Sequence, residues 1–218
     1  LGDLIGYGGT PNKTIDLIRR IQPNLVLRGN HDRTIVDLQY RNPTRWHRHQ
    51  KLERFSLIWT HNQITPENLM YLQRLPEGPK WLDEIQAVQF VHGSAFQIDD
   101  DILTQMDGKR HLKRSLNWVT FFAHTHIAAI HSTNQRLPLI YPEPDFPYPL
   151  STKNRYLINP GSVGQPRDMD SRASYAIFDY ESRTVHIKRI VYNIKAAQDK
   201  IRLAKLPKWH ADRIASGR

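Results

Sequence analysis

Hydrophobic spacing in the first third of the chain predicts two helices and one buried strand. Isoleucines recur at three-residue spacing from Ile15 to Ile21, and Pro11 suits a first helical turn, so we expect a helix over residues 11–21. Residues 24–28 form a short apolar run that is typical of a buried strand. Thr65 followed by a proline resembles a helix start, and we expect a helix from there to Leu75.

The remainder of the chain favours strands. Apolar runs predict strands over residues 87–91, 118–122, 127–131, 156–158, 174–180 and 184–192. Five prolines lie within residues 137–150, and this density predicts an irregular surface loop. An amphipathic helix is expected over residues 193–206. Helices and strands in this order indicate an α/β fold in a single domain over residues 1–218, with a basic helical tail from about residue 193.

Composition narrows the chemistry. With 218 residues the chain is long enough for one sizeable core. It has no cysteine, which excludes disulfides, a thiolate nucleophile and thiolate-bound zinc, so any metal must use His, Asp, Asn and water. No apolar run reaches the length of a membrane span, and together these features predict a cytoplasmic protein without a membrane partner.

The net charge of +10 is concentrated near the end of the chain. Residues 183–218 hold ten Lys and Arg against Asp199 and Asp212, a net of +8. Nucleic-acid binding is one interpretation of this segment, and a solvated charged face is the other. We favour the solvated face because no aromatic stacking series accompanies the charge.

We expect four polar clusters to lie at the ends of separate strands. They are Gly2-Asp3, Gly29-Asn30-His31-Asp32, His92-Gly93 and His124-Thr125-His126. Carboxyl ends of strands meet at one edge of a sheet, where α/β proteins place their sites. In an extended segment, residues two apart point the same way, so His124 and His126 would both face one site.

The clusters differ in how specific they are. Gly-Asp, His-Gly and His-x-His are each weak alone, whereas Gly-Asn-His-Asp directly after an apolar strand is costly to bury unless something binds it. Their joint occurrence in this order is what an ordinary core does not explain. We assign the other seven histidines to the surface or to the core: His47, His49, His61, His111, His131, His186 and His210.

The ordered motifs resemble the calcineurin-like metallophosphoesterase superfamily. The opening segment of the chain, residues 1–8, looks like that of the bacterial-type phosphoesterase branch. The similarity continues through residues 159–167 into the last strands. The resemblance implies a four-layer α/β/β/α sandwich of mixed sheets. Two features depart from the family. The family's Asp-x-His motif would lie upstream of Leu1, so we expect a truncated N-terminus that lacks a strand and helix. Ala123 replaces a glycine, with little expected effect.

The resemblance also implies a ligand set for two metal ions. Asp3 would bridge both ions. Asn30, His92 and His124 would complete one, and His126 would serve the other. Imidazole, carboxylate and amide oxygen suit manganese, iron, zinc or nickel.

Further roles are implied near the substrate. His31 would contact the phosphate and protonate the leaving group, and Asp32 would orient His31. Arg167 would reach a substrate phosphate, or its turn would instead pack beneath the ligands. Trp46 with its basic neighbours, and the proline-rich segment, are candidates for substrate selection, although surface cover is the favoured interpretation.

The expected function is therefore hydrolysis of phosphomonoesters or phosphodiesters by a hydroxide that two metal ions activate. Two alternatives come from other classes. A non-catalytic protein-binding scaffold could share the fold, but such proteins degrade the ligand set or the phosphate-contacting histidine, and both His31 and Asp32 are present. A nuclease or nucleic-acid-binding module would exploit the basic C-terminal segment.

Overall fold

A computed structural model describes residues 1–38, 51–82 and 85–218 of the chain. Trp46 and its basic neighbours lie outside the described residues. The chain divides into two compact units, one of residues 1–77 with 193–215 and one of residues 78–192 with 216–218. The assignment of a single domain stays a prediction.

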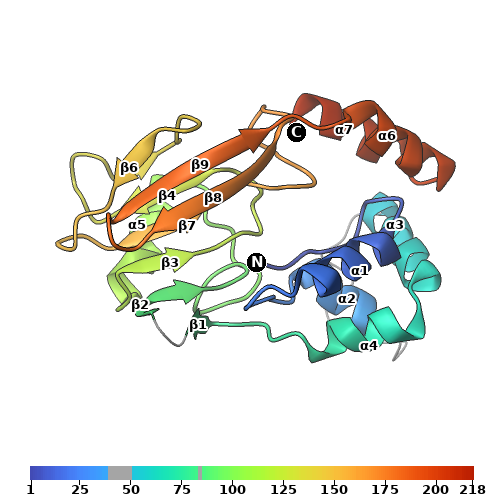
Figure 1. The fold of residues 1–218 in the computed structure, drawn as a ribbon, viewed down its shortest axis with the longest axis horizontal. Coiled ribbons are helices and arrows are strands. Elements are labelled where there is room, and N and C mark those ends of the chain that lie inside the picture. Colours follow the sequence, from blue (N-terminus) through green and yellow to red (C-terminus); the bar gives the residue numbers. More distant parts are fainter. Residues whose placement is uncertain (39–50, 83–84) are drawn as a thin grey trace. The chain divides into compact units, whose positions relative to one another are not determined.

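The first unit is helical. Its helices are α1 (Pro11–Ile21), α2 (Asn30–Leu38), α3 (Lys51–Gln63), α4 (Pro66–Arg74), α6 (Ile194–Leu203) and α7 (Lys208–Ser216) (Figure 1). The expected bounds of α1 are confirmed, and Thr65 caps α4 by accepting a hydrogen bond from Asn68 N at 3.3 Å. Buried aliphatic side chains from the first four helices and the segments beside them form its core: Ile5, Ile15, Ile35, Val36, Leu57, Leu72 and Leu75.

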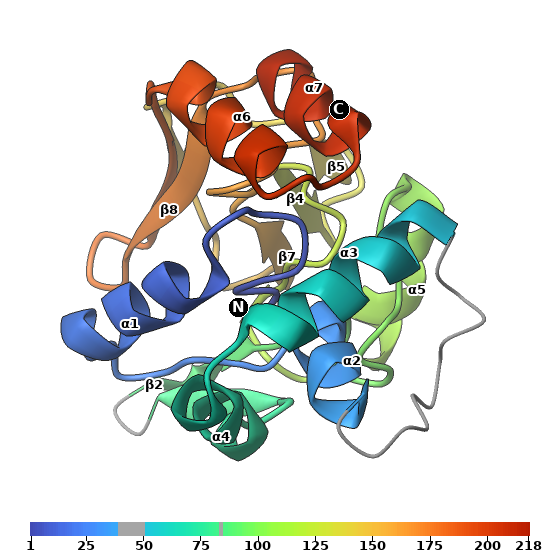
Figure 2. The same cartoon turned by 90° about the vertical axis from the view of Figure 1, so that its right-hand side faces the viewer.

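The C-terminal helices pack into this same unit. Helices α6 and α7 lie side by side (Figure 2). Ile201 and Ile214 are buried in a small cluster against which Trp59 of α3 packs. Ser56 of α3 and His210 of α7 also lie 2.7 Å apart, between Oγ and Nε2. The predicted helical tail is thus two helices with an apolar face against α3.

One expected strand of the first unit is wrong. Residues 24–29 are irregular rather than a strand, and α2 begins at Asn30 directly after them. Leu27 is buried as predicted, but a strand requires a ladder of backbone hydrogen bonds to a neighbour. Arg28 N of this segment donates to Pro76 O at 2.7 Å, and Pro76 lies just beyond α4 and not in a strand.

The second unit holds two sheets. In the part of the chain that the structure describes, the larger sheet has the order β1-β2-β3-β7-β4-β5, and the smaller has the order β6-β9-β8. The larger consists of β1 (Lys80–Leu82), β2 (Ile85–Phe90), β3 (Val119–Phe121), β7 (Tyr156–Asn159), β4 (Ala129–Ser132) and β5 (Leu139–Ile140). The smaller consists of β6 (Pro147–Pro149), β9 (Thr184–Ile190) and β8 (Ala173–Asp179). Strands β2, β3 and β7 are parallel and the other pairs are antiparallel, so the larger sheet is mixed, as predicted, and the smaller sheet is antiparallel.

Phe121, the last residue of β3, and Phe122, which follows it, point to opposite faces of the larger sheet and define the layers of this unit. Phe121 contacts Phe178 of the smaller sheet, with ring centroids 5.5 Å apart. Phe122 instead packs in a buried cluster with Leu112 of helix α5 (Gln105–Arg114). The larger sheet therefore lies between the smaller sheet and α5, and in Figure 2 β8 and α5 lie on opposite sides of β4 and β7.

The proline-rich segment is more regular than expected. Residues 137–150 contain β5 and β6, so the prediction of an irregular loop is wrong in part. Both strands lie at the edges of their sheets. An edge strand can hold proline because one side of its backbone needs no partner, and Pro147 and Pro149 flank Tyr148 in β6 accordingly.

A buried histidine of this unit should make stability depend on pH. His131 of β4 is 0% exposed, its ring nitrogens have no hydrogen-bond partner among the described residues, and a Cβ on Gly108 of α5 would overlap its Nδ1. Burial lowers the pKa of His131 to about 4, with Asp107 raising it and His111 lowering it. In the unfolded chain the pKa is near 6.5. The unfolded state therefore binds more protons between these values, and stability falls as pH falls from about 6.5 to about 4.

Between pH 7 and pH 5, we expect the free energy of unfolding of wild type to fall by about 2 kcal/mol more than that of His131→Leu. Urea unfolding at both pH values, with a chelator present, measures this difference. His186→Leu on β9, a half-buried position, is the matched control and should leave the pH dependence in place. Equal pH dependence in wild type and His131→Leu would contradict the assignment.

Candidate metal and phosphate site

A histidine or an asparagine lies at the carboxyl end of each of three parallel strands in the second unit. His92 follows β2, His124 follows β3, and Asn159 ends β7. The strand ends are level, because Phe90 pairs with Phe121 and Phe121 pairs with Ile158. The predicted convergence of strand ends is therefore present for these segments.

His92 and His124 direct ring nitrogens at one another. His92 Nε2 and His124 Nδ1 are 3.3 Å apart, and the two rings meet edge to face with centroids 5.1 Å apart. His92 is 1% exposed. Two imidazole nitrogens that bind one metal ion at about 2.0–2.1 Å lie about 3.0–3.4 Å from each other. The donor atoms of this pair thus fit a shared metal ion.

The His-x-His segment is not an extended strand, which corrects the expected geometry. His124 and His126 both have φ of 62°, in the left-handed region, and Thr125 N donates to Ala123 O at 2.7 Å. Asn159 holds this turn, because its Nδ2 donates to Ala123 O and to Thr125 Oγ1, each at 2.9 Å. A loop with this conformation needs such support, since left-handed backbone is unfavourable for residues with a side chain.

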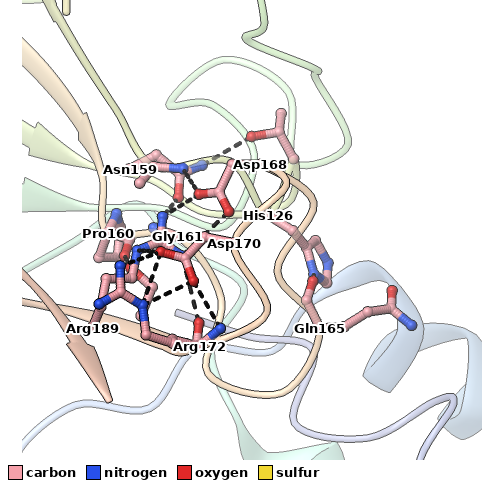
Figure 3. A network of polar contacts seen from close by, with 12 residues as sticks. His126, Asn159, Pro160, Gly161, Gln165, Asp168, Asp170, Arg172 and Arg189 are labelled. Carbon is pink, nitrogen blue, oxygen red and sulfur yellow. Dashed lines mark hydrogen bonds and ion pairs between the residues drawn. The ribbon is translucent and has the colours of Figure 1, made fainter. Parts of the chain in front are cut away.

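A backbone carbonyl sets the tautomer of His126. His126 Nδ1 lies 2.9 Å from Gln165 O (Figure 3). A carbonyl oxygen only accepts, so Nδ1 carries the proton and Nε2 of the neutral ring keeps its lone pair. This is the arrangement in which a histidine serves as a metal ligand through Nε2.

The turn over residues 159–167 packs against the histidine loop. Arg167 N donates to His126 O at 3.1 Å, and the Arg167 guanidinium donates to Gln165 Oε1 through Nε at 3.3 Å and Nη2 at 2.9 Å. Packing beneath the histidines, one of the two interpretations of this turn, is therefore present. Substrate contact by Arg167 stays a prediction.

In the first unit, Asp3 and Gly29 lie in close contact. Asp3 has φ of 54°, and its Oδ1 accepts a hydrogen bond from His31 N at 2.9 Å. A Cβ at position 29 would overlap Asp3 Oδ1, so only glycine allows this approach. The Gly-Asp and Gly-Asn-His-Asp motifs thus form one cluster, with Asn30 as the first residue of α2.

Asp32 is buried and organises this cluster through the backbone. It is 0% exposed and accepts hydrogen bonds from Leu4 N at 3.2 Å, Ile5 N at 3.3 Å and Gly29 N at 2.9 Å. Burial raises the pKa of the Asp32 carboxyl above its usual range, the Asp3 charge raises it further, and these backbone bonds oppose both. The bonds place Asp32 under the loop that carries Asp3. Orientation of the His31 ring by Asp32 stays a prediction.

His31 sits against aromatic and glycine neighbours. It is 8% exposed, and the Tyr7 ring meets it edge to face with centroids 4.7 Å apart. Tyr7 in turn stacks on His210 of α7 at 4.3 Å. A Cβ on Gly6 would lie 2.6 Å from His31 Nδ1, so the chain there leaves room only for glycine. The ring is held by packing rather than exposed on a mobile surface.

Sequence reasoning missed several supporting residues. Asn159 and Gln165 lay in a noted turn, but nothing in the pattern indicated their hydrogen bonds to the histidine loop. Asp101 had no signal at all, and its Oδ1 lies 3.5 Å from His124 Nε2. These contacts join residues that are far apart in the chain. The small side chain of Ala123 is compatible with its place, where its backbone N donates to His92 O at 2.8 Å.

Residues 1–183 match the family model described as the calcineurin-like phosphoesterase superfamily domain. The chain belongs to this superfamily, as the motifs predicted. Family membership supports phosphoester hydrolysis and divalent metal ions in general terms.

Several relatives resemble the whole chain. An uncharacterized protein of Methanocaldococcus jannaschii is 33% identical over 235 residues, covering 100% of this chain and 85% of that protein. The crystal structure of a metallophosphoesterase from Sphaerobacter thermophilus superposes with a TM-score of 0.85 at 32% identity, covering 100% of this chain and 86% of the other. A hypothetical protein from Pyrococcus horikoshii, with a TM-score of 0.75 and 20% identity over 100% of this chain and 83% of that one, shares the fold. The mixed α/β fold is thereby confirmed.

In the described part of the chain, no helix has both the length and the apolar character that a membrane span requires.

Proposed function

We propose that this protein hydrolyses phosphate monoesters or diesters with two divalent transition metal ions. Asp3, Asn30, His92, His124 and His126 supply the ligands in this proposal, in the order that the family motifs imply. The observation that carries it is the convergence of His92 Nε2 and His124 Nδ1 at 3.3 Å. Membership of a phosphoesterase superfamily gives that donor pair its chemical meaning.

Two bound divalent ions would clamp the phosphate and lower the pKa of water to about 7. Residues of the chain set the tautomer of one proposed ligand and supply charge at another. Gln165 O keeps the proton of His126 on Nδ1, which leaves Nε2 as the donor. Asp3 contributes negative charge, and its Oδ1 accepts a hydrogen bond from the backbone N–H of His31 at 2.9 Å.

His31 is proposed to contact the phosphate and to deliver a proton to the leaving group. Its enclosed position between Gly6 and Tyr7 restricts the ring to few orientations, which favours proton transfer along one direction. Asp32 supports the same loop by accepting the backbone N–H groups of Leu4, Ile5 and Gly29. Arg167 is proposed to bind a substrate phosphate with the guanidinium donors that Gln165 does not use.

The basic C-terminal helices are better explained as a solvated face. On α6, Lys195 and Arg202 both pair with Asp199, at 3.0 and 3.2 Å, and on α7 Lys208 lies 4.0 Å from Asp212. Part of the positive charge is therefore neutralised locally. We do not extend the proposal to nucleic acid as a substrate or partner.

We expect elemental analysis to find about two transition metal ions per chain after incubation with manganese, and turnover of a chromogenic phosphate monoester or diester that a chelator abolishes. Manganese, iron, zinc and nickel should be compared, because this donor set accepts each of them. Bound metal without turnover on either ester would favour a scaffold that kept the fold. The absence of both bound metal and turnover would overturn the proposal.

A further inference from the structure

The segment that follows the turn at 159–164 contacts the His126 loop at three points. Gln165 O accepts from His126 Nδ1 at 2.9 Å, and Arg167 N donates to His126 O at 3.1 Å. Asp168 Oδ2 then accepts from Ala128 N at 3.1 Å, two residues beyond His126 (Figure 3). Residues 165–168 therefore hold both the ring and the backbone of this histidine.

Asp168 is in turn held by a buried arginine from another strand. Arg189 of β9 donates through Nη1 to Asp168 Oδ1 at 3.2 Å and pairs through Nη2 with Asp168 Oδ2. The side chains are only 6% and 12% exposed, respectively. Planar two-point pairing of this kind fixes both the position and the orientation of a carboxylate.

Burying an ion pair costs desolvation free energy, which the attraction between the charges offsets only when their geometry is good. The pair is not needed to join β8 and β9, because these strands already share a continuous antiparallel ladder. What the pair adds is a fixed acceptor for Ala128 N, at the exit of a loop whose two histidines both have left-handed backbone. A loop in that conformation relaxes when its support is removed.

We propose that Asp168, anchored by Arg189, is a positioning residue for His126. The pair keeps the loop registered against Gln165, so that the His126 ring retains its Nδ1–H tautomer and presents Nε2 to a metal ion. This inference rests on the proposed function for the metal ion itself. The tautomer and its support rest on contacts within the second unit alone.

Asp170 provides a matched control two residues away. Among the described residues, the Asp170 carboxylate accepts hydrogen bonds from Arg172, through N and Nε at 3.0 Å and Nη2 at 2.7 Å. Its Oδ2 also lies 3.7 Å from Arg189 Nε. It thus shares Arg189 and the same segment with Asp168, but its bonds run to Arg172 rather than to the histidine loop. Removing Asp170 disturbs the ion network and spares the contact with Ala128.

The test compares Asp168→Ala, Asp168→Asn and Asp170→Ala with wild type. Manganese titration by calorimetry is expected to show one of two ions bound about 10- to 100-fold more weakly in Asp168→Ala. Asp168→Asn should lie between Asp168→Ala and wild type, because its side-chain oxygen still accepts from Ala128 N. Asp170→Ala should bind both ions as wild type does. Equal losses in Asp168→Ala and Asp170→Ala, or wild-type affinity in a folded Asp168→Ala, would overturn the proposal.

A second readout needs no metal. Nitrogen-15 shifts of the His126 ring in chelated protein should report the Nδ1–H tautomer in wild type and in Asp170→Ala, and a mixture of tautomers in Asp168→Ala. If wild type binds no metal but the tautomer responds in this way, the positioning role stands and the proposed function fails. If metal binds and the tautomer is unchanged in Asp168→Ala, the positioning role fails alone. Should Asp168→Ala fail to fold, Asp168→Asn carries both measurements.

Discussion

Asp3→Asn is expected to lose metal-dependent hydrolysis by roughly 10³-fold or more, with loss of bound metal. If Asp3 binds metal as proposed, its loss would remove bound ions that would each supply several kcal/mol of charge stabilisation in the transition state, and each 1.4 kcal/mol is about tenfold in rate. Asparagine has nearly the same shape, and its side-chain oxygen can still accept from His31 N, as Asp3 Oδ1 does at 2.9 Å. The substitution therefore removes charge while it keeps the local hydrogen bond.

Turnover of the chromogenic ester and elemental analysis of the same preparation measure the two effects together. The matched control is Asp16→Asn on α1, where Asp16 Oδ1 accepts from Asn68 Nδ2 at 3.0 Å and an amide oxygen can do the same. This variant should keep metal and turnover. If Asp3→Asn retained two metal ions and full turnover, Asp3 would not be a ligand.

His31→Ala is expected to lower turnover by about 10²- to 10⁴-fold while metal content stays near wild type. The reason is that His31 is proposed to handle the phosphate and the leaving-group proton, not to bind metal. Its side chain packs between Gly6 and Tyr7, so alanine leaves a space beside Tyr7 without removing a proposed ligand.

Comparing substrates sharpens this second prediction. An ester with a good leaving group needs little proton donation, so His31→Ala should impair it less than an ester with a poor leaving group. His61→Ala on α3, where His61 Nδ1 contacts Ile35 O at 2.9 Å, is the histidine control in the same unit and should retain turnover on both. Loss of metal in His31→Ala would instead make His31 a ligand.

Local signals were sufficient for helices α1 and α4. A proline in the first turn and isoleucines at helical spacing give α1 its predicted bounds, and the Thr65 cap gives α4 its start. These signals act between residues a few positions apart, so a sequence pattern contains them in full. Helix α5 was not predicted, although the capping box of Thr104 and Asp107 is a local signal that the sequence contains.

Pairing between distant segments was not predictable in the same way. Residues 24–28 have the apolar composition of a strand but make no strand in the described chain, whereas two segments among the prolines of 137–150 do. Whether an extended segment becomes a strand depends on the neighbour that supplies its hydrogen bonds. That neighbour is chosen by the whole fold.

The motifs alone identify the family and the candidate donor atoms, which are a carboxylate at Asp3, imidazoles at His92, His124 and His126, and an amide at Asn30. How these groups are held depends on contacts that form in the folded chain. The left-handed turns at His124 and His126, the Nδ1–H tautomer set by Gln165 O, and the Asp168–Arg189 pair all depend on residues 21 to 39 positions apart. Hydrogen bonds across such separations form only after the strands have brought the loops together, so no local pattern contains them.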